Sequence, residues 1–550
     1  MATTIEPTAL DGLAEEYWDA WLERHPVYAT AIGDRRFDDR LADESPEGRT
    51  RWGARLDEFG RRLEATGGGD AVTRAAFAEM LTSDRAFLEA DLGSFSVDPM
   101  DGSHVEILNI PPYQSVRNAE EAAALLARWS AVPAYLDQAG ANLRRGAAEG
   151  RIGVSMLCGK VIGQLDELLA RPDAEWPLIE PAEQRPEMRE GLLTVINEEI
   201  RPAFERYRSL IADELAPRAR PDDRPGLAHL AGGAKAYAKL ARAHTSLDRT
   251  PEEVHELGLN EIARIDDEFI EMGNRLLRTD GLAPTLAALR DDPALHFRSA
   301  DEIVGVARAS LDRANAAVGE WFGRLPRTEC EVVRMPAHEE KHSTIAYYRE
   351  PAADGSRPGQ YIVNTHAPQT RPRYEAETLA FHESVPGHHL QIAIAQELGN
   401  LPAFRRFWGS TAFIEGWGLY TERLSDEMGL LSGEVDRFGI LSFDAWRASR
   451  LVVDTGIHAF GWARRAAIDF MMAHTALGEN NVANEVDRYI AYPGQALAYK
   501  IGQLELLRLR SEARERQRDR FDIRRFHDVV LGEGAVPLPA LRVVVEHELD

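Results

Sequence analysis

The stretch from His382 to His389 reads His-Glu-Ser-Val-Pro-Gly-His-His. A zinc-protease helix normally reads His-Glu-x-x-His, because a spacing of four places both imidazoles on one helical face and leaves the glutamate as general base. Here Pro386 occupies the fifth position, so the usual spacing is absent. Pro386 cannot donate a hydrogen bond to the carbonyl of His382, and Gly387 tolerates unusual dihedral angles. We therefore expect a kink or bulge within this segment.

Two histidines beyond the break compete for the place of the second ligand. Two looped-out residues would bring His388 to that place. In an unbroken helix, His389 would share the face of His382, since seven residues make nearly two turns. Their Cα atoms would then lie ~10.5 Å apart along the axis, an awkward span for two ligands ~2.1 Å from one zinc. We predict His388 as the ligand and keep His389 as the alternative.

A second predicted helix supplies a carboxylate. The carboxylate is that of Glu415, the first residue of the run Glu-Gly-Trp-Gly-Leu-Tyr-Thr-Glu. Two histidines and one glutamate with an open fourth position form a catalytic zinc set. We predict one zinc per chain, held by His382, His388 and Glu415, with Glu383 as general base. Glu422 lies two turns beyond Glu415 and is either a partner of a ligand imidazole or a surface acid.

Composition restricts the class of protein. The chain has 550 residues, 44% hydrophobic and 28% charged, with a formal net charge of −26. This acidity argues against a nucleic-acid partner and against an anionic membrane surface. Two distant cysteines make no disulfide framework, and neither the start of the chain nor any apolar run indicates a leader or a membrane span. We expect a cytoplasmic protein, and the sequence does not indicate its oligomeric state.

The pattern along the chain predicts a mainly α fold. The first 300 or so residues have the pattern of helices joined by polar loops, with clear helix-start signals at 250–253 and 299–302. Three short β-prone segments, 331–335, 344–348 and 360–364, predict a small antiparallel sheet beside the active-site helix. We expect two helical lobes around a deep cleft, with residues 1–300 as one lobe and 301–550 as the catalytic lobe, in one continuous metallopeptidase-like unit.

At these motifs the chain resembles a widespread bacterial family of undefined function that is marked by His-Glu-x-x-Pro-Gly-His-His. That family is similar to the gluzincin metallopeptidases, including the thimet oligopeptidase and angiotensin-converting enzyme families. Their second ligand follows a glycine, as His388 follows Gly387, and their third ligand is a glutamate on the next long helix, which matches Glu415. Segments 25–34, 232–237, 454–458 and 492–502 extend the resemblance over nearly the whole chain.

The resemblance implies a zinc hydrolase that cleaves peptide or other amide bonds in small substrates, of the carboxypeptidase or oligopeptidase type. It also implies an oxyanion donor from a late helix. Tyr499 is the first choice and Tyr492 the alternative. His458 is a further catalytic candidate, because it shares a polar helical face with Asp454, Arg447 and Arg450; the same face is equally consistent with an interhelical salt-bridge network.

Substrate-binding residues are predicted from residue type and position. Arg450 and Lys500 are cations that suit a substrate carboxylate, and Gln495 lies in the late segment that carries Tyr499. The strand with Tyr361 and Asn364 could offer an edge to an extended peptide. Two rivals remain: a metal-dependent lyase or non-peptide amidohydrolase with the same ligands, and a non-catalytic metal-binding protein. The intact Glu383 argues against the second rival, since a binding protein needs no general base.

Overall fold

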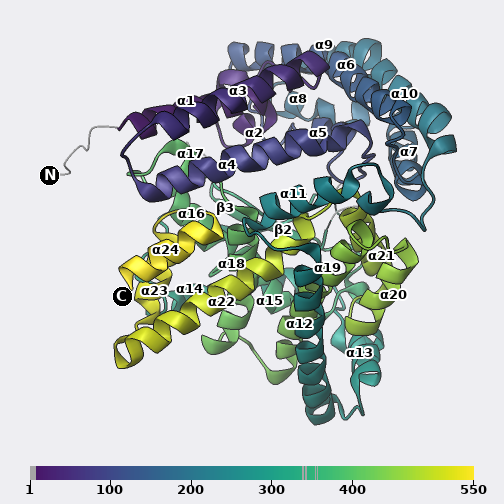
Figure 1. The fold of residues 1–550 in the computed structure, drawn as a ribbon. Helices are drawn as coiled ribbons and strands as arrows, with labels where there is room; N and C mark the ends of the chain where they lie inside the picture. Colours follow the sequence, from purple (N-terminus) through teal and green to yellow (C-terminus); the bar gives the residue numbers. More distant parts are fainter. Residues whose placement is uncertain (1–7, 337–339, 341–343, 353–354, 356, 550) are drawn as a thin grey trace.

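The computed structural model describes residues 8–336, 340, 344–352, 355 and 357–549. Residues 1–7, which bear on the expected absence of a leader, lie outside that range. Helices dominate the described chain, so the predicted mainly α class is confirmed (Figure 1). None of the described helices is long and apolar enough to cross a membrane.

The first part of the chain is helical throughout. Its α-helices are α1 (Ala9–Arg24), α2 (Pro26–Ala31), α3 (Pro46–Ala65), α4 (Ala71–Ala90), α5 (Ser103–Leu108), α6 (Ala119–Ala148), α7 (Ser155–Leu169), α8 (Pro181–Gln184), α9 (Arg189–Val195), α10 (Arg201–Ser209), α11 (Gly233–Thr245), α12 (Pro251–Met272), α13 (Leu282–Asp291) and α14 (Ala300–Ala317). Thr250 caps α12 in a capping box with Glu253, and Ser299 caps α14, as the sequence predicts.

Helices also form the chain beyond the sheet. They are α15 (Arg373–Glu383), α16 (His388–Glu397), α17 (Ala403–Phe407), α18 (Thr411–Glu427), α19 (Arg437–His458), α20 (Arg464–His474), α21 (Glu479–Ala491), α22 (Ala498–Gln517), α23 (Ile523–Leu531) and α24 (Leu538–Glu548). Helix α15 packs against α14, α18 and α19, while α19 packs along α12. The helices that carry the predicted metal ligands are therefore held on several sides.

The small sheet is mixed, which corrects the predicted antiparallel arrangement. Its strands are β1 (Cys330–Arg334), β2 (Ala346–Arg349) and β3 (Gly359–Val363), in the order β1-β3-β2. β2 and β3 pair antiparallel, but β3 inserts between its two predecessors and runs parallel to β1. The positions of strands follow from local sequence, whereas their pairing depends on the path of the connecting chain. β3 is consequently paired on both edges.

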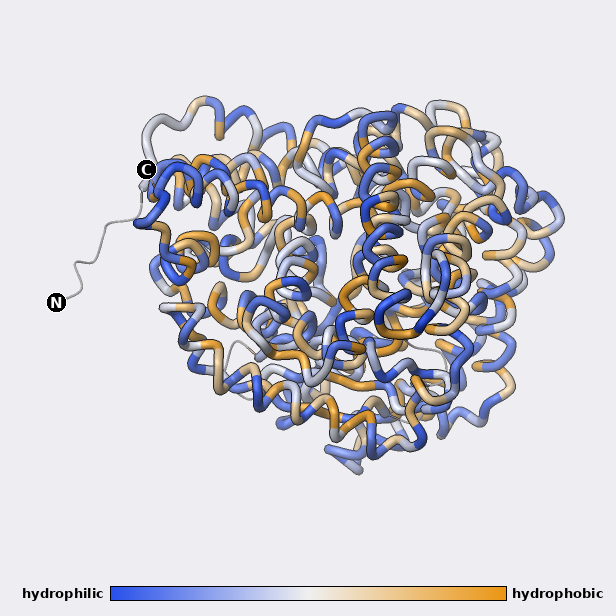
Figure 2. The backbone as a smooth tube through the Cα atoms, turned by 90° about the horizontal axis from the view of Figure 1, so that it is seen from below, coloured by the Kyte–Doolittle hydropathy of each residue, from blue (hydrophilic) through white to orange (hydrophobic). Residues whose placement is uncertain are grey.

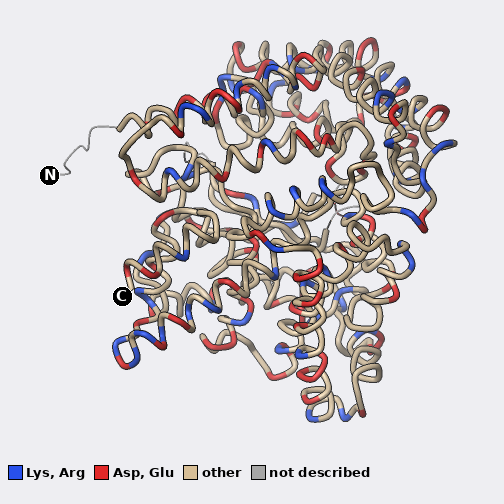
Figure 3. Tube along the Cα trace, viewed as in Figure 1, with Lys and Arg blue, Asp and Glu red and all other residues tan. Residues whose placement is uncertain are grey.

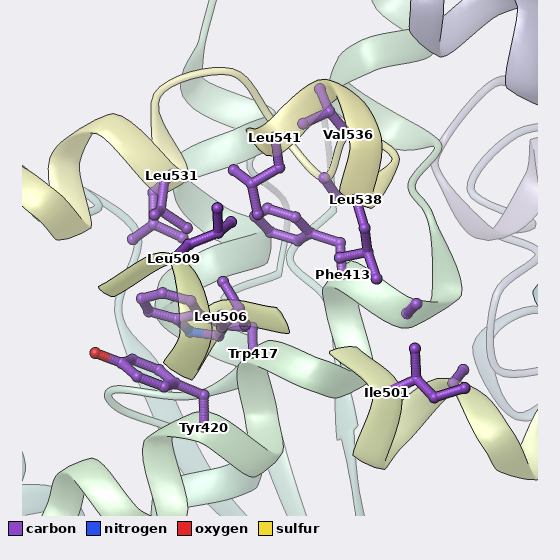
Figure 4. Close-up of a cluster of buried hydrophobic side chains, with 14 of the residues drawn as sticks. Phe413, Trp417, Tyr420, Ile501, Leu506, Leu509, Leu531, Val536, Leu538 and Leu541 are labelled. Atoms are coloured by element: carbon purple, nitrogen blue, oxygen red, sulfur yellow. The ribbon is translucent and has the colours of Figure 1, made fainter. Parts of the chain in front are cut away.

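Apolar side chains from distant segments build the core around α18 and α22. Phe413, Trp417 and Tyr420 of α18 meet residues of the helices near the C-terminus (Figure 4). The two helices approach closely because glycine faces glycine: a Cβ on Gly416 would lie 2.4 Å from the Cα of Gly502. This close crossing fixes the position of α18, and with it the position of Glu415.

Hydrophobic and hydrophilic residues alternate along the helices (Figure 2), and acidic and basic residues are interspersed over the chain (Figure 3). Several buried apolar clusters join residues from both sides of position 300; one of them joins Ile262 of α12 to Ala445 of α19. The boundary at residue 300 and the deep cleft stay predictions.

Candidate metal centre

The helix breaks where the sequence predicts a break. α15 ends at Glu383 and α16 begins at His388, with a turn between them. A Cβ on Gly387 would lie 1.9 Å from the carbonyl oxygen of His382, so the turn can close only around glycine. The turn folds the start of α16 back toward the end of α15, and the rings of His382 and His388 come to 4.7 Å between centroids at 88°.

Three of the predicted ligands converge. One donor atom each from His382, His388 and Glu415 lies within 4.8 Å of the others. Oε2 of Glu415 is 3.5 Å from Nε2 of His388 and 3.9 Å from Nε2 of His382. Tetrahedral ligands ~2.1 Å from zinc lie roughly 3.4 Å apart, so small side-chain rotations would bring these donors onto one ion. The donor set fits zinc in number, type and spacing.

The His382 imidazole is held from behind. Its Nδ1 lies 2.8 Å from Oε1 of Glu422, a side chain that is 1% exposed, so Glu422 is a buried partner of His382 and not a surface acid. This contact directs the Nε2 lone pair toward the other donors. Burial, and then the charge of His388, lower the pKa of His382 well below its usual value, which favours the neutral ring that a metal requires.

Space for that ring comes from Gly418, which the sequence analysis did not identify. A Cβ on Gly418 would lie 2.7 Å from Cε1 and 2.8 Å from Nε2 of His382. A glycine in mid-helix carries no local signal of this kind, because the group that needs the space comes from another helix.

His389 points elsewhere. Its Nδ1 lies 2.9 Å from the hydroxyl of Tyr348 on β2, and its Nε2 lies 3.0 Å from the carbonyl oxygen of Thr328. The carbonyl can only accept, so Nε2 carries the proton and Nδ1 accepts from the tyrosine. Both nitrogens are thus engaged, and of the two histidines it is His388 that the structure brings to His382 and Glu415.

Glu383, the predicted base, lies beside the cluster. Burial raises the pKa of its carboxyl to about 7, although the charge of His388 acts in the opposite direction. The carboxylate accepts a hydrogen bond from the backbone N–H of Tyr348. β2 therefore orients the carboxylate of Glu383, which its sequence does not reveal, since the donor is a main-chain group.

Tyr499 interacts with the charge of Glu415, a predicted ligand. Burial raises the pKa of Tyr499, and the charge of Glu415 raises it further. Its hydroxyl interacts with Gln495, whose Oε1 also accepts from Arg488 at 2.8 Å. Tyr492 instead packs edge-on against His244 at 5.2 Å between centroids. The structure brings Tyr499 and Gln495 together near the candidate ligands.

Both ring nitrogens of His458 already have hydrogen-bond partners in the backbone. Its Nδ1 accepts from the backbone N–H of Leu227 at 3.1 Å, and its Nε2 donates to the carbonyl of Tyr489 at 2.9 Å. Burial lowers its pKa to about 4. The ring joins three segments of backbone, and we do not carry its predicted catalytic role forward.

Lys500 is committed to a buried ion-pair network. Its ammonium contacts Asp444, Glu261 at 3.1 Å and Gln503 at 2.8 Å. Three partners use all three of its donors. The predicted role in binding a substrate carboxylate is therefore not carried forward.

The predicted substrate-binding strand has no free edge. β3 lies in the middle of the sheet, and Tyr361 is 1% exposed. The amide nitrogen of Asn364 donates to the carbonyls of Glu340 and Thr344, and its oxygen accepts from the N–H of His366. These two residues support the sheet and its loop. A peptide that added to this sheet would have to do so at an outer strand.

Two guanidinium groups on α19 also face the centre. The pKa of Glu415 is lowered overall, although burial acts to raise it. The hydrogen bond to His388 and its charge lower this pKa, and the charges of Arg450 and Arg447 lower it further. Arg447 is 5% exposed and Arg450 is 3% exposed. The centre thus combines two imidazoles, several carboxylates and two buried cations.

The comparisons with known proteins concern the whole chain. A candidate lipoprotein from Colwellia psychrerythraea is 26% identical with a TM-score of 0.92, and the match covers 98% of each chain. A candidate lipoprotein of unknown function from Shewanella oneidensis is 18% identical with a TM-score of 0.73, covering 98% of this chain and 99% of the other. No curated protein matches. The model of a family of bacterial proteins of unknown function, DUF885, matches residues 26–545, and the chain belongs to that family.

Proposed function

We propose that this chain is a zinc-dependent hydrolase that cleaves peptide or other amide bonds in small substrates. The observation that carries the proposal is the convergence of His382, His388 and Glu415, with Glu383 beside them. Two histidines and one glutamate leave a fourth position open, which is typical of catalytic rather than structural zinc. The order and type of these residues along the chain also support a relationship to the gluzincin metallopeptidases.

Each residue of the centre has a chemical task in this proposal. His382, His388 and Glu415 would hold zinc, which would lower the pKa of a water molecule and polarise the scissile carbonyl. Glu383, oriented by the N–H of Tyr348, takes a proton from the attacking water and returns it to the leaving amine. Tyr499 donates its hydroxyl hydrogen to the oxygen on which negative charge develops.

Exposure is consistent with access from the side of Glu415. The side chain of Glu415 is 20% exposed, against 10% for His388 and 2% for His382. The ring of His382 therefore forms the floor of the centre, and a substrate would approach over the carboxylate. A binding protein without catalysis would have no use for a buried base at this point.

The test combines metal analysis with a peptide-library digest. We expect about one zinc per chain after reconstitution, lost in the double variant His382→Ala, Glu415→Ala. We expect Glu383→Gln to keep zinc and fold and to lose turnover by ~10²–10⁴. Absence of a bound transition metal in the reconstituted wild type would overturn the proposal. Metal binding without cleavage of any peptide would redirect it to a non-peptide amide or to a lyase reaction.

A further inference from the structure

Helix α19 is buried along almost its whole length, from Phe438 to His458, and yet it carries many polar side chains. Most of them are fully paired. Asp444 binds Lys500 and Arg423, and Asp454 accepts from the hydroxyl of Tyr237 at 2.6 Å. Such pairing is the rule for buried polar groups, because an unmade hydrogen bond in the interior is costly.

Three neighbours on α19 depart from that rule. Nε and Nη1 of Arg447, Oγ of Ser449 and Nη1 of Arg450 are buried, and within the described part of the chain none has a hydrogen-bond partner. Nε and Nη2 of Arg450 do bind the hydroxyl of Tyr489 at 2.9 Å and the carboxylate of Glu485 at 3.0 Å. The carboxylate nearest to Arg447 is that of Glu422, at 4.0 Å, which is too long for a hydrogen bond.

The two guanidinium groups share two aromatic side chains, Tyr499 and Trp446. The Cζ of Arg450 lies 4.3 Å from the ring centroid of Tyr499, and that of Arg447 lies 6.0 Å from the same centroid. The ring centroid of Trp446 lies 4.8 Å from the Cζ of Arg450 and 4.3 Å from the Cζ of Arg447. Stacking on aromatic faces holds the guanidinium planes in place without using their N–H donors. The stacking therefore fixes both cations and leaves Nε and Nη1 of Arg447 and Nη1 of Arg450 without a hydrogen-bond partner in the described chain.

We infer that Arg447 and Arg450 bind the terminal carboxylate of a peptide substrate. A guanidinium fork matches a carboxylate in a two-pronged geometry, and the pairing is strong where water is excluded. This inference rests on the proposed function, and it makes the enzyme an exopeptidase that acts at the C-terminal end of short peptides.

The distance to the metal centre suits that assignment. The Oε1 atom of Glu422 lies 2.8 Å from Nδ1 of His382 and 4.0 Å from Nη2 of Arg447. On the other side of the His382 ring, the charges of both arginines act on the carboxyl of Glu415, and both guanidinium groups lie against Tyr499. Since an extended residue spans ~3.3–3.6 Å, a carboxylate bound to them would lie only a few residues beyond the bond at the metal. Hydrolysis there adds water across the amide bond and releases a short C-terminal fragment as the free amine.

The test measures binding separately from turnover. Glu383→Gln protein, loaded with zinc, is titrated calorimetrically with acetyl-Ala-Ala-Ala and with its C-terminal amide. We expect the acid to bind ~10–100-fold more tightly, since the amide cannot form charge-assisted hydrogen bonds with both arginines. We expect this preference to vanish when Arg447→Gln and Arg450→Gln are added. Equal affinity for acid and amide overturns the inference.

Controls separate recognition from folding. Arg437→Gln changes an exposed cation at the start of the same helix, which pairs with Asp426, and should keep the preference. Arg447→Gln removes a guanidinium whose Nε and Nη1 have no hydrogen-bond partner among the described residues, and it should fold with a melting temperature near that of the parent. Arg447→Lys keeps the charge and loses the fork, so it should weaken binding of the acid selectively.

Other results would also test the inference or separate it from the proposed function. If Arg447 served only Glu422, its replacement would change zinc affinity and leave the preference for the acid intact, which overturns the inference. Tighter binding of inorganic phosphate than of the acid peptide would also overturn it. Cleavage of acid and amide peptides at equal rates leaves the proposed function standing and overturns the exopeptidase assignment. Acid-selective binding without cleavage of any peptide by the wild type supports the carboxylate site and overturns the exopeptidase assignment.

Discussion

Replacing Gly418 by alanine tests whether His382 is a metal ligand. The new Cβ would lie 2.7 Å from Cε1, 2.8 Å from Nε2 and 3.1 Å from Nδ1 of His382. Carbon atoms in contact prefer ~3.5–4.0 Å, so the ring has to move by roughly 0.7 Å or more. Metal–ligand distances tolerate only about ±0.2 Å. We therefore expect the variant to lose zinc affinity.

The size of the loss follows from the displaced ligand. Disturbing the support of a ligand imidazole typically costs ~10–100-fold in metal affinity, and we expect at least the lower figure here. The free energy of unfolding of the metal-free protein should change less than its zinc affinity. Alanine in mid-helix gains ~1 kcal/mol over glycine, while overpacking costs ~1–3 kcal/mol, so the metal-free variant should be destabilised by about 2 kcal/mol or less.

The assay is a competition titration of metal-free protein against a fluorescent zinc chelator, beside thermal melts. The matched control is Gly305→Ala on α14, where a Cβ meets nothing within 4 Å. It should gain ~1 kcal/mol of stability and keep the zinc affinity. If Gly418→Ala bound zinc with wild-type affinity, the assignment of His382 as ligand would be refuted. The substitution displaces the His382 ring, and a displaced ligand could not leave the zinc affinity unchanged.

Three further predictions are open to direct measurement. His388→Ala should weaken zinc binding more than His389→Ala, and the reverse order in the same titration would move the second ligand to His389. Tyr499→Phe should lower kcat by ~10²–10³ with little change in KM or melting temperature; a fall in stability with unchanged kcat would make it a packing residue. Burial raises the pKa of Asp84, on α4, to about 7, so between pH ~4 and 7 the folded protein keeps a proton that the unfolded chain has lost. This one proton makes stability fall by about 1.4 kcal/mol per pH unit as pH rises through that window. Asp84→Asn should reduce the slope in melts from pH ~5 to 7 by that amount and leave the part that is due to other buried carboxyls, such as Asp454, whose pKa burial also raises to about 7.

Local features of the fold were predictable because their causes are local. A threonine or serine followed three residues later by glutamate places the starts of α12 and α14. The Pro386-Gly387 pair predicts the turn between α15 and α16 in the same way. The strands lie within two residues of their predicted limits. The parallel pairing of β1 and β3 could not be predicted, since it depends on how the chain returns to the sheet.

The site was predictable only where its residues share one motif or one helical face. Spacing on a helix tells which side chains point the same way, but it does not tell what stands opposite. Lys500 was predicted as a cation that suits a substrate carboxylate, yet Asp444 and Glu261 from two other helices contact its ammonium. His458 is likewise met by the backbone at Leu227 and Tyr489.

The most informative feature of the centre is therefore an exception to packing rules. A sequence specifies one structure when its buried polar groups are paired, and departures from that rule concentrate where function requires them. Along α19 the pairing is complete at Asp444, Asp454 and His458, but within the described chain it is incomplete at Arg447 and Arg450. These two arginines also carry charges that act on the carboxyl of Glu415. Buried guanidinium N–H groups that lack an acceptor cost stability in the free protein, and a substrate that supplies a carboxylate would recover that cost as binding energy.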